Sequence, residues 1–589
     1  MAPRPVTAVG SLAVTAGPTA SELVDDFNAA IASLTAVDAP FGWTVRDVNG
    51  VPVRVYDNAM ENMRAVWLMS GAHGDQDYLV YGDERCSYTE AHARVRALAH
   101  HLRTKHGAGP GTRVAISMRN YPEWVLSHWA AISVGAAVVG MNSWWTRPEI
   151  EFALGDCEPV ALIVDGERLE RLGPARDDVP LIVTRHRGEL PATAWRWDAV
   201  ADPAAAPDAL PDADIDPDDD ALIFYTSGTT GTPKGAQLTH RAVVHNLLNM
   251  IFVTACSDAA QARRRARSGD GGPPAEAPPV VAMLPVPLFH VTGCNCVLHT
   301  VTIAGGRLVM MYRWDAAEAL RLIEREGVSV FTGVPSMSRE LLQHPDWERT
   351  DTSSLRSMGG GGAAIPTDLV RRIDDGLSEG RPGVGYGLTE TAGVATAIGN
   401  EFFVANPSSV GPLVPCMEAR VVDEEGATLD PGCRGELLLR GPNVMKGYLN
   451  RPDATAEAIV DGWFRTGDIA EIDAAGWISI KDRIKDVVIR GGENVHCSEV
   501  EDAIYELDSV AEAAVFGLPD ERLGEEVAAA VVLVAGAQLD QAGLIAHLDG
   551  RLARFKHPRH VWFLDEALPR NANGKFLKRE LRKRLAPDV

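Results

Sequence analysis

The chain has 589 residues and a formal net charge of −24, from 56 Lys and Arg against 80 Asp and Glu. Because phosphate backbones are bound by basic surfaces, this balance argues against a nucleic-acid-binding protein, although a few local donors can still hold a small anion. Hydrophobic residues make up 46% of the chain and charged residues 23%, as in soluble globular proteins, and the length predicts about three to five compact units.

The cysteines and the apolar runs favour a location in the reducing cytoplasm. Eight cysteines are scattered along the chain without a CxxC pair. The closest pair, Cys294 and Cys296, has no His or Cys partners at zinc spacing, so we interpret both as small buried residues. No apolar run reaches about 18 residues, and the first residues form only a weak apolar stretch, so we expect neither an integral membrane span nor a signal peptide.

The N-terminal half alternates between apolar runs and helical periodicity. After a lead-in, residues 21–34 show helical spacing, and so do residues 121–135, whereas several short apolar runs suit buried strands. These runs cover residues 113–118, 136–142, 159–165 and 180–185. Alternating strands and helices are typical of a parallel sheet, so the predicted fold class is α/β.

Two polar stretches interrupt this pattern. Residues 201–220 consist mostly of Pro, Ala and Asp and are interpreted as a solvated connector. Residues 257–279 look like an insertion of low complexity, for which we expect a disordered, solvated loop. The alternative for this stretch is a docking patch formed by its arginines, Arg263, Arg264, Arg265 and Arg267.

Near residue 480 the pattern changes to a small α+β unit of roughly 100 residues with a basic tail. We therefore expect a large N-terminal domain, residues 1–484, and a small C-terminal domain, residues 485–589. A small domain joined by a short segment is typical of a mobile cap.

The stretch YTSGTTGTPKG, residues 225–235, is typical of a phosphate-binding loop. Its glycines let backbone N–H groups approach an anion, its hydroxyls add donors and Lys234 adds positive charge. The Walker spacing is absent and no Ser or Thr follows Lys234, so an ordinary P-loop NTPase is excluded. The residues expected to hold phosphates are Thr226, Ser227, Gly228, Thr229, Thr230, Gly231 and Lys234.

This loop resembles the signature of the adenylate-forming superfamily, which includes acyl-CoA synthetases, peptide-synthetase adenylation domains and beetle luciferases. Further motifs look like those of the same superfamily, in its order and rough spacing. They are PLFHVTG (287–293), MGGGGAAIP (358–366), GYGLTETAG (385–393), RGPNVMKGYLN (440–450), GWFRTGDIAEID (462–473), DRIKDVVIRGGENVHCSEVE (482–501) and LPRNANGKFLKREL (568–581). The resemblance covers about residues 50–589 and is nearest to the fatty-acid–CoA ligases.

The resemblance implies a large domain of layered α/β sheets, a small mobile α+β domain and a reaction in two halves. A carboxylic acid and ATP would give acyl-AMP and pyrophosphate, with Mg²⁺ as cofactor. A thiol, that of coenzyme A, would then displace AMP and give acyl-CoA. The loop at residues 225–235 would hold the β- and γ-phosphates, which leave as pyrophosphate.

Four residues are expected at the reacting groups. Lys575 sits where the family has its catalytic lysine, which would bridge the carboxylate and the α-phosphate, two anions that need a cation between them. Glu390 matches the magnesium-linked glutamate, a hard oxygen ligand. Thr389 would contact the α-phosphate, and His290 resembles the residue beside the acyl carboxylate.

The resemblance also implies a nucleoside site and a hinge. Tyr386 would stack on adenine beside a glycine-rich wall, and Asp468 and Arg483 would bind the ribose. The wall comprises Gly361, Gly362 and Ala363. Lys485 lies where the family has its domain hinge. A rotation there would withdraw Lys575 and bring in a turn whose glycines, Gly491 and Gly492, would border the pantetheine tunnel.

Two rival functions stay open beside an AMP-forming acid–CoA ligase. One is a stand-alone ligase that runs mainly one half-reaction or delivers the acyl group to a carrier protein. The other, of a different class, is a non-catalytic regulator that binds ATP and acyl groups. The expected substrate is a fatty or bulky hydrophobic acid, although no motif names it, and a homodimer is one candidate for the oligomeric state.

Overall fold

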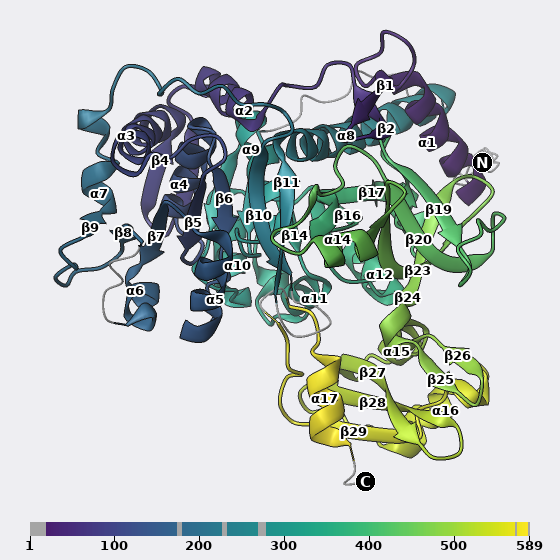
Figure 1. Cartoon of the computed structure of the whole chain (residues 1–589). Coiled ribbons are helices and arrows are strands. Elements are labelled where there is room, and N and C mark those ends of the chain that lie inside the picture. Colours follow the sequence, from purple (N-terminus) through teal and green to yellow (C-terminus); the bar gives the residue numbers. More distant parts are fainter. Residues whose placement is uncertain (1–18, 174–178, 227–232, 269–278, 572–573, 587–589) are drawn as a thin grey trace, which may run out of the picture.

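The computed structural model describes residues 19–173, 179–226, 233–268, 279–571 and 574–586. Figure 1 shows a large body that carries the elements up to β24 and a small body that carries those from β25 onward. The helices of the large body are α1 (Ala20–Leu34), α2 (Met63–Ser70), α3 (Tyr88–His106), α4 (Pro122–Ser133), α5 (Arg147–Cys157), α6 (Gly166–Leu172), α7 (Trp197–Val200), α8 (His240–Ser268), α9 (His299–Ile303), α10 (Ala316–Glu326), α11 (Pro335–Gln343), α12 (Thr367–Gly376), α13 (Asn400–Ala405) and α14 (Pro452–Ala458).

The first eight-stranded sheet contains the apolar runs of the N-terminal half. Its order is β21 (Gly447–Tyr448), β11 (Lys234–Thr239), β10 (Asp220–Thr226), β6 (Ala137–Gly140), β5 (Arg113–Ser117), β7 (Ala161–Asp165), β8 (Leu181–Thr184) and β9 (Ala194–Arg196). Strands β5 to β8 pair in parallel and are almost entirely buried, with α4 packed against β5 and β6. Parallel strands buried in this way read as continuous apolar runs, so the α/β prediction is confirmed.

The second eight-stranded sheet brings glycine-rich strands together. Its order is β17 (Gly393–Gly399), β16 (Arg381–Leu388), β15 (Ser357–Gly361), β14 (Val330–Gly333), β12 (Val281–Leu284), β13 (Arg307–Met310), β3 (Asp77–Tyr81) and β4 (Glu84–Ser87). A Cβ on Gly359 would lie 1.9 Å from the carbonyl oxygen of Gly383, so only glycine fits this approach of two backbones.

The largest hydrophobic core joins side chains of both eight-stranded sheets. Trp67 and Trp129 stack with ring centroids 5.1 Å apart and are fully buried. The indole N–H of Trp129 donates a 3.0 Å hydrogen bond to the hydroxyl of Tyr78, which is buried as well. This hydrogen bond lets the rings of Trp129 and Tyr78 fill the space between the sheets without leaving their polar groups unpaired.

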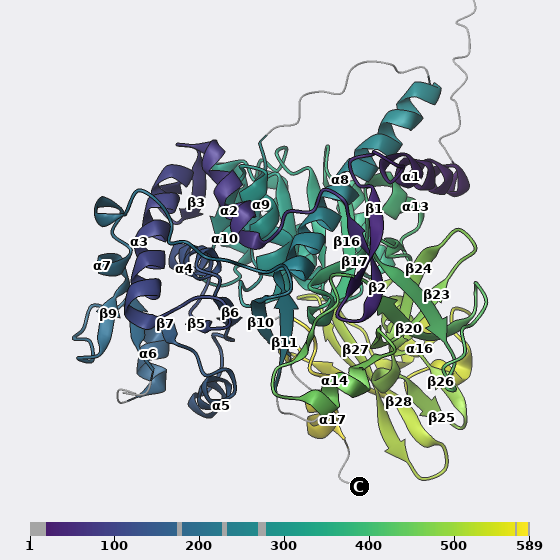
Figure 2. The same cartoon turned by 45° about the horizontal axis from the view of Figure 1, so that its top comes forward.

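Smaller sheets complete the large body. A two-stranded ribbon consists of β1 (Trp43–Val48) and β2 (Val51–Tyr56). An antiparallel sheet has the order β18 (Gly411–Pro412), β24 (Trp477–Arg483), β23 (Trp463–Ile472), β20 (Arg434–Arg440) and β19 (Glu418–Val422), with β22 (Ile459–Val460) paired to β23. Figure 2 shows this sheet beside the small body, and the chain passes from β24 through a short turn, Ile484–Asp486, to β25.

The small body has a sheet and cores of its own, and the sheet lies within residues 485–589. The sheet order is β26 (Glu493–Val495), β25 (Val488–Arg490), β28 (Gly524–Leu533) and β27 (Val510–Asp520), with β29 (His560–Leu564) paired to β28. The helices are α15 (Cys497–Tyr505), α16 (Gln541–Leu548) and α17 (Lys578–Leu585). Apolar residues of both faces of the sheet are buried, which gives an α+β unit.

The prediction of a disordered loop at residues 257–279 is wrong for the part that the structure describes. Helix α8 continues to Ser268 and packs against α1. Arg264 forms an ion pair with Glu401 of α13 at 2.6 Å, and Arg267 pairs with Asp26 of α1. Ala and Arg are strong helix formers, and these partners on neighbouring helices stabilise the extension. Residues 269–278 lie outside the described part of the chain.

The connector at residues 201–220 is only partly solvated. Its carbonyl groups accept hydrogen bonds along the large body: Arg96 donates to Pro207 at 2.8 Å and Arg64 to Pro211 at 2.8 Å. The Ile215 side chain is buried. The segment is therefore bound along its length, because its backbone acceptors find donors on α2 and α3.

Cys294 is buried as predicted, and Cys296 is half-buried. The structure adds partners that sequence spacing did not reveal. The Sγ of Cys294 lies 3.6 Å from Nε2 of His299, which lies 3.0 Å from Nε2 of His128. Within the described residues, the Nδ1 atoms of both histidines have no hydrogen-bond partner. Metal-bound histidines normally donate that N–H to an acceptor, so we interpret the group as a buried hydrogen-bonded cluster.

One helix in the described part of the chain, residues 240–267 of α8, is long and apolar enough to cross a membrane by length and composition alone. More than half of its most apolar window, 56%, is buried inside the protein, as expected of a core helix.

Candidate active site

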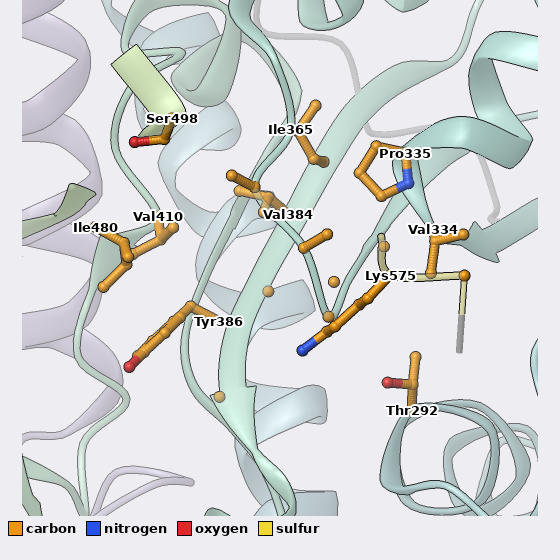
Figure 3. A pocket seen from close by; sticks show the side chains of 18 of the residues that line it. Thr292, Val334, Pro335, Ile365, Val384, Tyr386, Val410, Ile480, Ser498 and Lys575 are labelled. Carbon is orange, nitrogen blue, oxygen red and sulfur yellow. The ribbon is translucent and has the colours of Figure 1, made fainter. Parts of the chain in front are cut away.

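A cavity of about 2240 Å³ is lined by residues of both bodies. The large body contributes β14 to β17, β23, β24 and the start of α11, and the small body contributes α15 and the segment around Lys575. Figure 3 shows the amino end of Lys575 pointing into this space, between Tyr386 and Thr292. Most of the predicted site residues line this one cavity.

Lys575 carries its charge in an unusual environment. Burial lowers the pKa of its amine to about 8, and the nearby Arg483 guanidinium acts in the same direction. The carboxylates of Asp468 and Glu390 oppose this shift. Burial makes the charged form of Lys575 unfavourable, and an anionic ligand beside the amine would stabilise that charge.

Asp468 lies at the centre of a polar group on β23 and β24. Its side chain is 6% exposed, and its Oδ2 accepts a 2.7 Å hydrogen bond from the hydroxyl of Tyr386. Nε of Arg483 lies 3.5 Å from Oδ1, since Asp468 and Arg483 face each other in the strand register. Burial raises the pKa of Asp468, and the Arg483 charge opposes this rise.

Glu390 and Thr389 lie in a short 3₁₀ turn, Thr389–Thr391, directly after β16, and both are buried. Oε1 of Glu390 accepts a 2.8 Å hydrogen bond from the hydroxyl of Tyr448. The Nζ of Lys234 lies 5.1 Å from the centroid of the same tyrosine ring. Sequence reasoning missed Tyr448, although it stands inside the quoted motif RGPNVMKGYLN.

The described ends of the predicted phosphate-binding loop lie on neighbouring strands. Thr226 ends β10 and Lys234 begins β11, and the two residues are partners in the antiparallel register. Both line the cavity. The remaining predicted loop residues lie outside the described part of the chain; they are Ser227, Gly228, Thr229, Thr230 and Gly231.

His290 and the glycine-rich wall lie near Lys575. Burial and the Lys575 charge lower the pKa of His290 to about 3, so the imidazole is neutral. Its Nδ1 accepts a 3.3 Å hydrogen bond from the backbone N–H of Thr292, which leaves the proton on Nε2. Gly361, Gly362 and Ala363 line the cavity, and a Cβ on Gly362 would lie 4.0 Å from Cε of Lys575.

The structure does not bring every predicted residue to the cavity. Lys485 lies in the turn Ile484–Asp486 between the two bodies and lines it. Gly491 and Gly492 form the turn between β25 and β26 and are absent from the described lining. In Figures 1 and 2 this hairpin lies on the opposite side of the small body from α17.

The residues present fit a magnesium ion bound together with phosphates. Mg²⁺ is usually held by one or two carboxylates and by substrate phosphate oxygens, rather than by a cage of protein ligands. Glu390 supplies one carboxylate at the cavity wall, and Tyr448, which donates to that carboxylate, is also the ring over which the Lys234 amine lies.

Comparisons with known proteins agree with this site. The AMP-binding enzyme model matches residues 69–449, and the model of its C-terminal domain matches residues 499–575. The chain therefore belongs to the AMP-binding enzyme family, within the adenylate-forming superfamily, and the prediction of an AMP-forming acid–CoA ligase is confirmed at this level.

Individual relatives cover nearly the whole chain. A feruloyl-CoA synthase of Amycolatopsis sp is 36% identical over 86% of this chain and 95% of its own. The long-chain-fatty-acid–CoA ligase FadD13 of Mycobacterium tuberculosis is 33% identical over 86% of this chain and 94% of its own. Among solved structures, ATP-bound MatB from Rhodopseudomonas palustris is 30% identical, covers 88% of this chain and 98% of its own, and has a TM-score of 0.73.

Proposed function

We propose that the protein activates a hydrophobic carboxylic acid with ATP and transfers the acyl group to coenzyme A, working between a domain of residues 1–484 and a mobile domain of residues 485–589. The observation that carries this proposal is the convergence of Lys575, Glu390 and Asp468 on one cavity from both bodies. These are the group types that a reaction between two anions needs: a cation, a metal ligand and a ribose acceptor.

In the first half-reaction a carboxylate oxygen attacks the α-phosphorus of ATP. The bond between the α-phosphorus and the bridging oxygen breaks, and pyrophosphate leaves with the electron pair, so no net proton transfer is required. The Lys575 ammonium lies between the two anions and lowers their repulsion, while Thr389 donates to the α-phosphate. Mg²⁺ bound at Glu390 would neutralise phosphate charge.

His290 orients the acid in this scheme. Because its neutral ring carries the proton on Nε2, it donates a hydrogen bond to one oxygen of the acyl carboxylate. Asp468 accepts from the ribose hydroxyls, Arg483 donates to the same sugar, and the Tyr386 ring packs on adenine. Lys234 and the glycine-rich loop bind the pyrophosphate that leaves.

The second half-reaction requires another arrangement of the small domain. A rotation at Lys485 withdraws Lys575 and brings the turn with Gly491 and Gly492 to the cavity. The thiol of coenzyme A then attacks the acyl carbonyl carbon, loses its proton, and AMP leaves with the electrons of the broken C–O bond. Both glycines have positive φ, 61° and 87°, and carry no side chain that would obstruct pantetheine.

The acid is hydrophobic, either fatty or bulky. Apolar side chains of α8 and of the π-helical segment Thr292–Leu298 line the same cavity as His290, among them Met250, Val253 and Val297. The relatives activate acids of both kinds: one is a feruloyl-CoA synthase and another a long-chain-fatty-acid–CoA ligase. A site lined in this way binds acids through the area of their apolar surface.

A panel of acids tests the proposal when each acid is assayed separately for ATP-dependent pyrophosphate release and for CoA thioester. Hydrophobic acids should give both products, with malonate and acetate far behind. ATP binding without either product for any acid would favour the non-catalytic regulator. Pyrophosphate release without a thioester would favour delivery to a carrier protein.

A further inference from the structure

The segment that carries Lys575 is a hairpin, described at residues 569–571 and 574–577, and hydrogen bonds join its two arms. The backbone N–H of Asn571 donates to the carbonyl of Lys575 at 2.9 Å, and the N–H of Lys575 donates to Oδ1 of Asn571 at 3.0 Å. Further from the tip of the hairpin, the N–H of Leu577 donates to the carbonyl of Pro569 at 2.8 Å. The position of Lys575 therefore follows the position of this hairpin.

An ion pair at the base of the hairpin holds it. The Arg570 guanidinium donates from Nη2 to Oε1 of Glu512 at 2.6 Å and from Nη1 to the carbonyl of Gly574 at 3.0 Å. The other oxygen of Glu512 accepts the backbone N–H of Leu568 at 2.6 Å. The carboxylate thus fixes the start of the hairpin and also aims the guanidinium at the peptide group directly before Lys575.

The two side chains are well placed to act together. They are 21% and 15% exposed, so the pair is shielded from solvent on most sides. Cζ of Arg570 also lies 4.4 Å from the centroid of the Phe576 ring, which restricts the guanidinium to one plane. A planar fork that serves two acceptors at once is a property of Arg that Lys cannot reproduce.

The hairpin is also pressed against the large body. Gly574 has a φ of 76°, and a Cβ there would lie 2.7 Å from Cγ2 of Val334. A side chain at position 574 would therefore collide with Val334, so the hairpin lies directly against the cavity wall. A shift of the hairpin would change the direction in which the lysine enters the cavity, and displacements of about 1 Å at a reacting group can cost about 100-fold in rate.

We propose that Glu512 and Arg570 are positioning residues for Lys575: the carboxylate aims the guanidinium at the Gly574 carbonyl, and this contact sets the entry of the lysine into the cavity. The inference rests on the proposed function, in which Lys575 serves the first half-reaction. It gives a role to two residues of the cavity lining to which the proposed reaction scheme assigns none.

The rival explanation is an ordinary ion pair that only stabilises the small domain. The two explanations differ in what a charge-reversed pair achieves. In the double variant Glu512→Arg/Arg570→Glu the ion pair can form again, but a carboxylate at position 570 cannot donate to the Gly574 carbonyl. A stabilising pair would be rescued by the reversal, whereas a positioning pair would not.

The test measures both half-reactions in Glu512→Gln and Arg570→Lys, with melting temperatures for each. We expect kcat for pyrophosphate release to fall about 10- to 100-fold. The KM for ATP should stay within about threefold, and thioester formation from supplied acyl-AMP within about twofold. Glu506→Gln serves as the matched control, since its 2.9 Å pair with Arg551 lies in the same body but away from the hairpin.

The outcomes are separable. An equal loss of both half-reactions, full adenylation in Arg570→Lys, or rescue by the charge-reversed pair would each overturn the inference. Lys575→Ala, measured in the same series, reports on the proposed function. If that variant keeps adenylation, the role of Lys575 fails; if it loses adenylation alone while Glu512→Gln and Arg570→Lys do not, only the positioning inference fails.

Discussion

The hydroxyl of Tyr386 donates a 2.7 Å hydrogen bond to Oδ2 of Asp468, a residue 82 positions further along the chain. The contact joins the end of β16 to β23 and so ties the adenine side of the proposed site to its ribose side. Arg483, opposite Asp468 in the strand register, lies beside the other carboxylate oxygen, with Nε 3.5 Å from Oδ1. Two sheets of different topology therefore meet in the proposed nucleoside site.

Asp468→Asn should weaken ATP use more than it weakens folding. The amide keeps the shape of the side chain but loses the charge that accepts two ribose hydroxyls, and charge-assisted hydrogen bonds are about twice as strong as neutral ones. We expect kcat/KM for ATP to fall about 10- to 100-fold, equivalent to about 1.4–2.7 kcal/mol. Tyr386→Phe, which leaves the carboxylate in place, should lose less. An Asp468→Asn enzyme with an unchanged KM and kcat for ATP would contradict the ribose assignment.

Lys575→Ala should abolish pyrophosphate release and spare thioester formation from supplied acyl-AMP. The amine is needed only while two anions approach each other, and acyl-AMP already contains the new bond. Adenylation should drop by at least about 100-fold. Single-turnover measurements with each half-reaction started separately provide the comparison, and parallel loss of both would remove the assigned role.

The lowered pKa of Lys575 predicts how the rate of adenylation depends on pH. Burial and the charges of Arg483 and Lys485 lower its pKa from 10.5 to about 8, against the opposing carboxylates of Asp468 and Glu390. The protonated form is the active one, so kcat/KM for pyrophosphate release should fall as pH rises through 8, by about tenfold for each further unit.

Lys575→Arg is the control for this pH profile, because a guanidinium stays charged throughout the range. Its rate should be lower, and its alkaline decline should disappear. If the decline persisted unchanged in Lys575→Arg, another group would be responsible for it.

Gly492→Leu should harm mainly the CoA step. Its φ of 87° makes any side chain strained, and a leucine there would project into the proposed pantetheine tunnel once the small domain has rotated. We expect thioester formation to fall at least about tenfold while pyrophosphate release stays within about twofold. Gly536→Leu has a similar φ of 82° in open space, so it separates backbone strain from obstruction. Equal effects of the two variants would argue against the tunnel.

Arg267→Ala should destabilise the large domain. It leaves the carboxylate of Asp26, which is 2% exposed, without its cationic partner on α8. Because half of Arg267 itself is exposed, we expect a modest cost of about 1–2 kcal/mol, seen as a lower apparent melting temperature. Arg321→Ala removes an exposed pair with Glu318 and should change little. A melting temperature unaffected by Arg267→Ala would speak against the docking of α8 on α1.

Much of the site could be predicted because the reaction demands particular groups in particular motifs. Lys575, Glu390, His290 and Asp468 were all expected, and all line the same cavity. Tyr448 was missed because its contact with Glu390 depends on β21 joining the edge of the first sheet, a pairing that no local pattern announces. The pair Glu512 and Arg570 was missed because the two residues lie 58 positions apart in the sequence, with Glu512 on β27, and no local pattern predicts their contact.

Local composition gave a wrong prediction where the structure of a segment depends on partners far away in the sequence. Residues 257–268 looked disordered because they are polar and of low complexity, yet they form the end of α8, where Arg264 and Arg267 find carboxylates on α13 and α1. The same limit applied to Cys294, whose neighbours His128 and His299 come from α4 and α9. Propensity and spacing report only on neighbours along the chain.

The sequence by itself determined the α/β class, the order of the motifs and the chemical groups available for catalysis. These follow from hydrophobic periodicity and from the functional groups that the side chains carry. Only the tertiary structure decided that the hairpin of Lys575, rather than the turn of Gly491 and Gly492, faces the cavity, and that Glu512 holds this hairpin through Arg570. Such choices depend on distances between residues far apart in the chain, which packing alone sets.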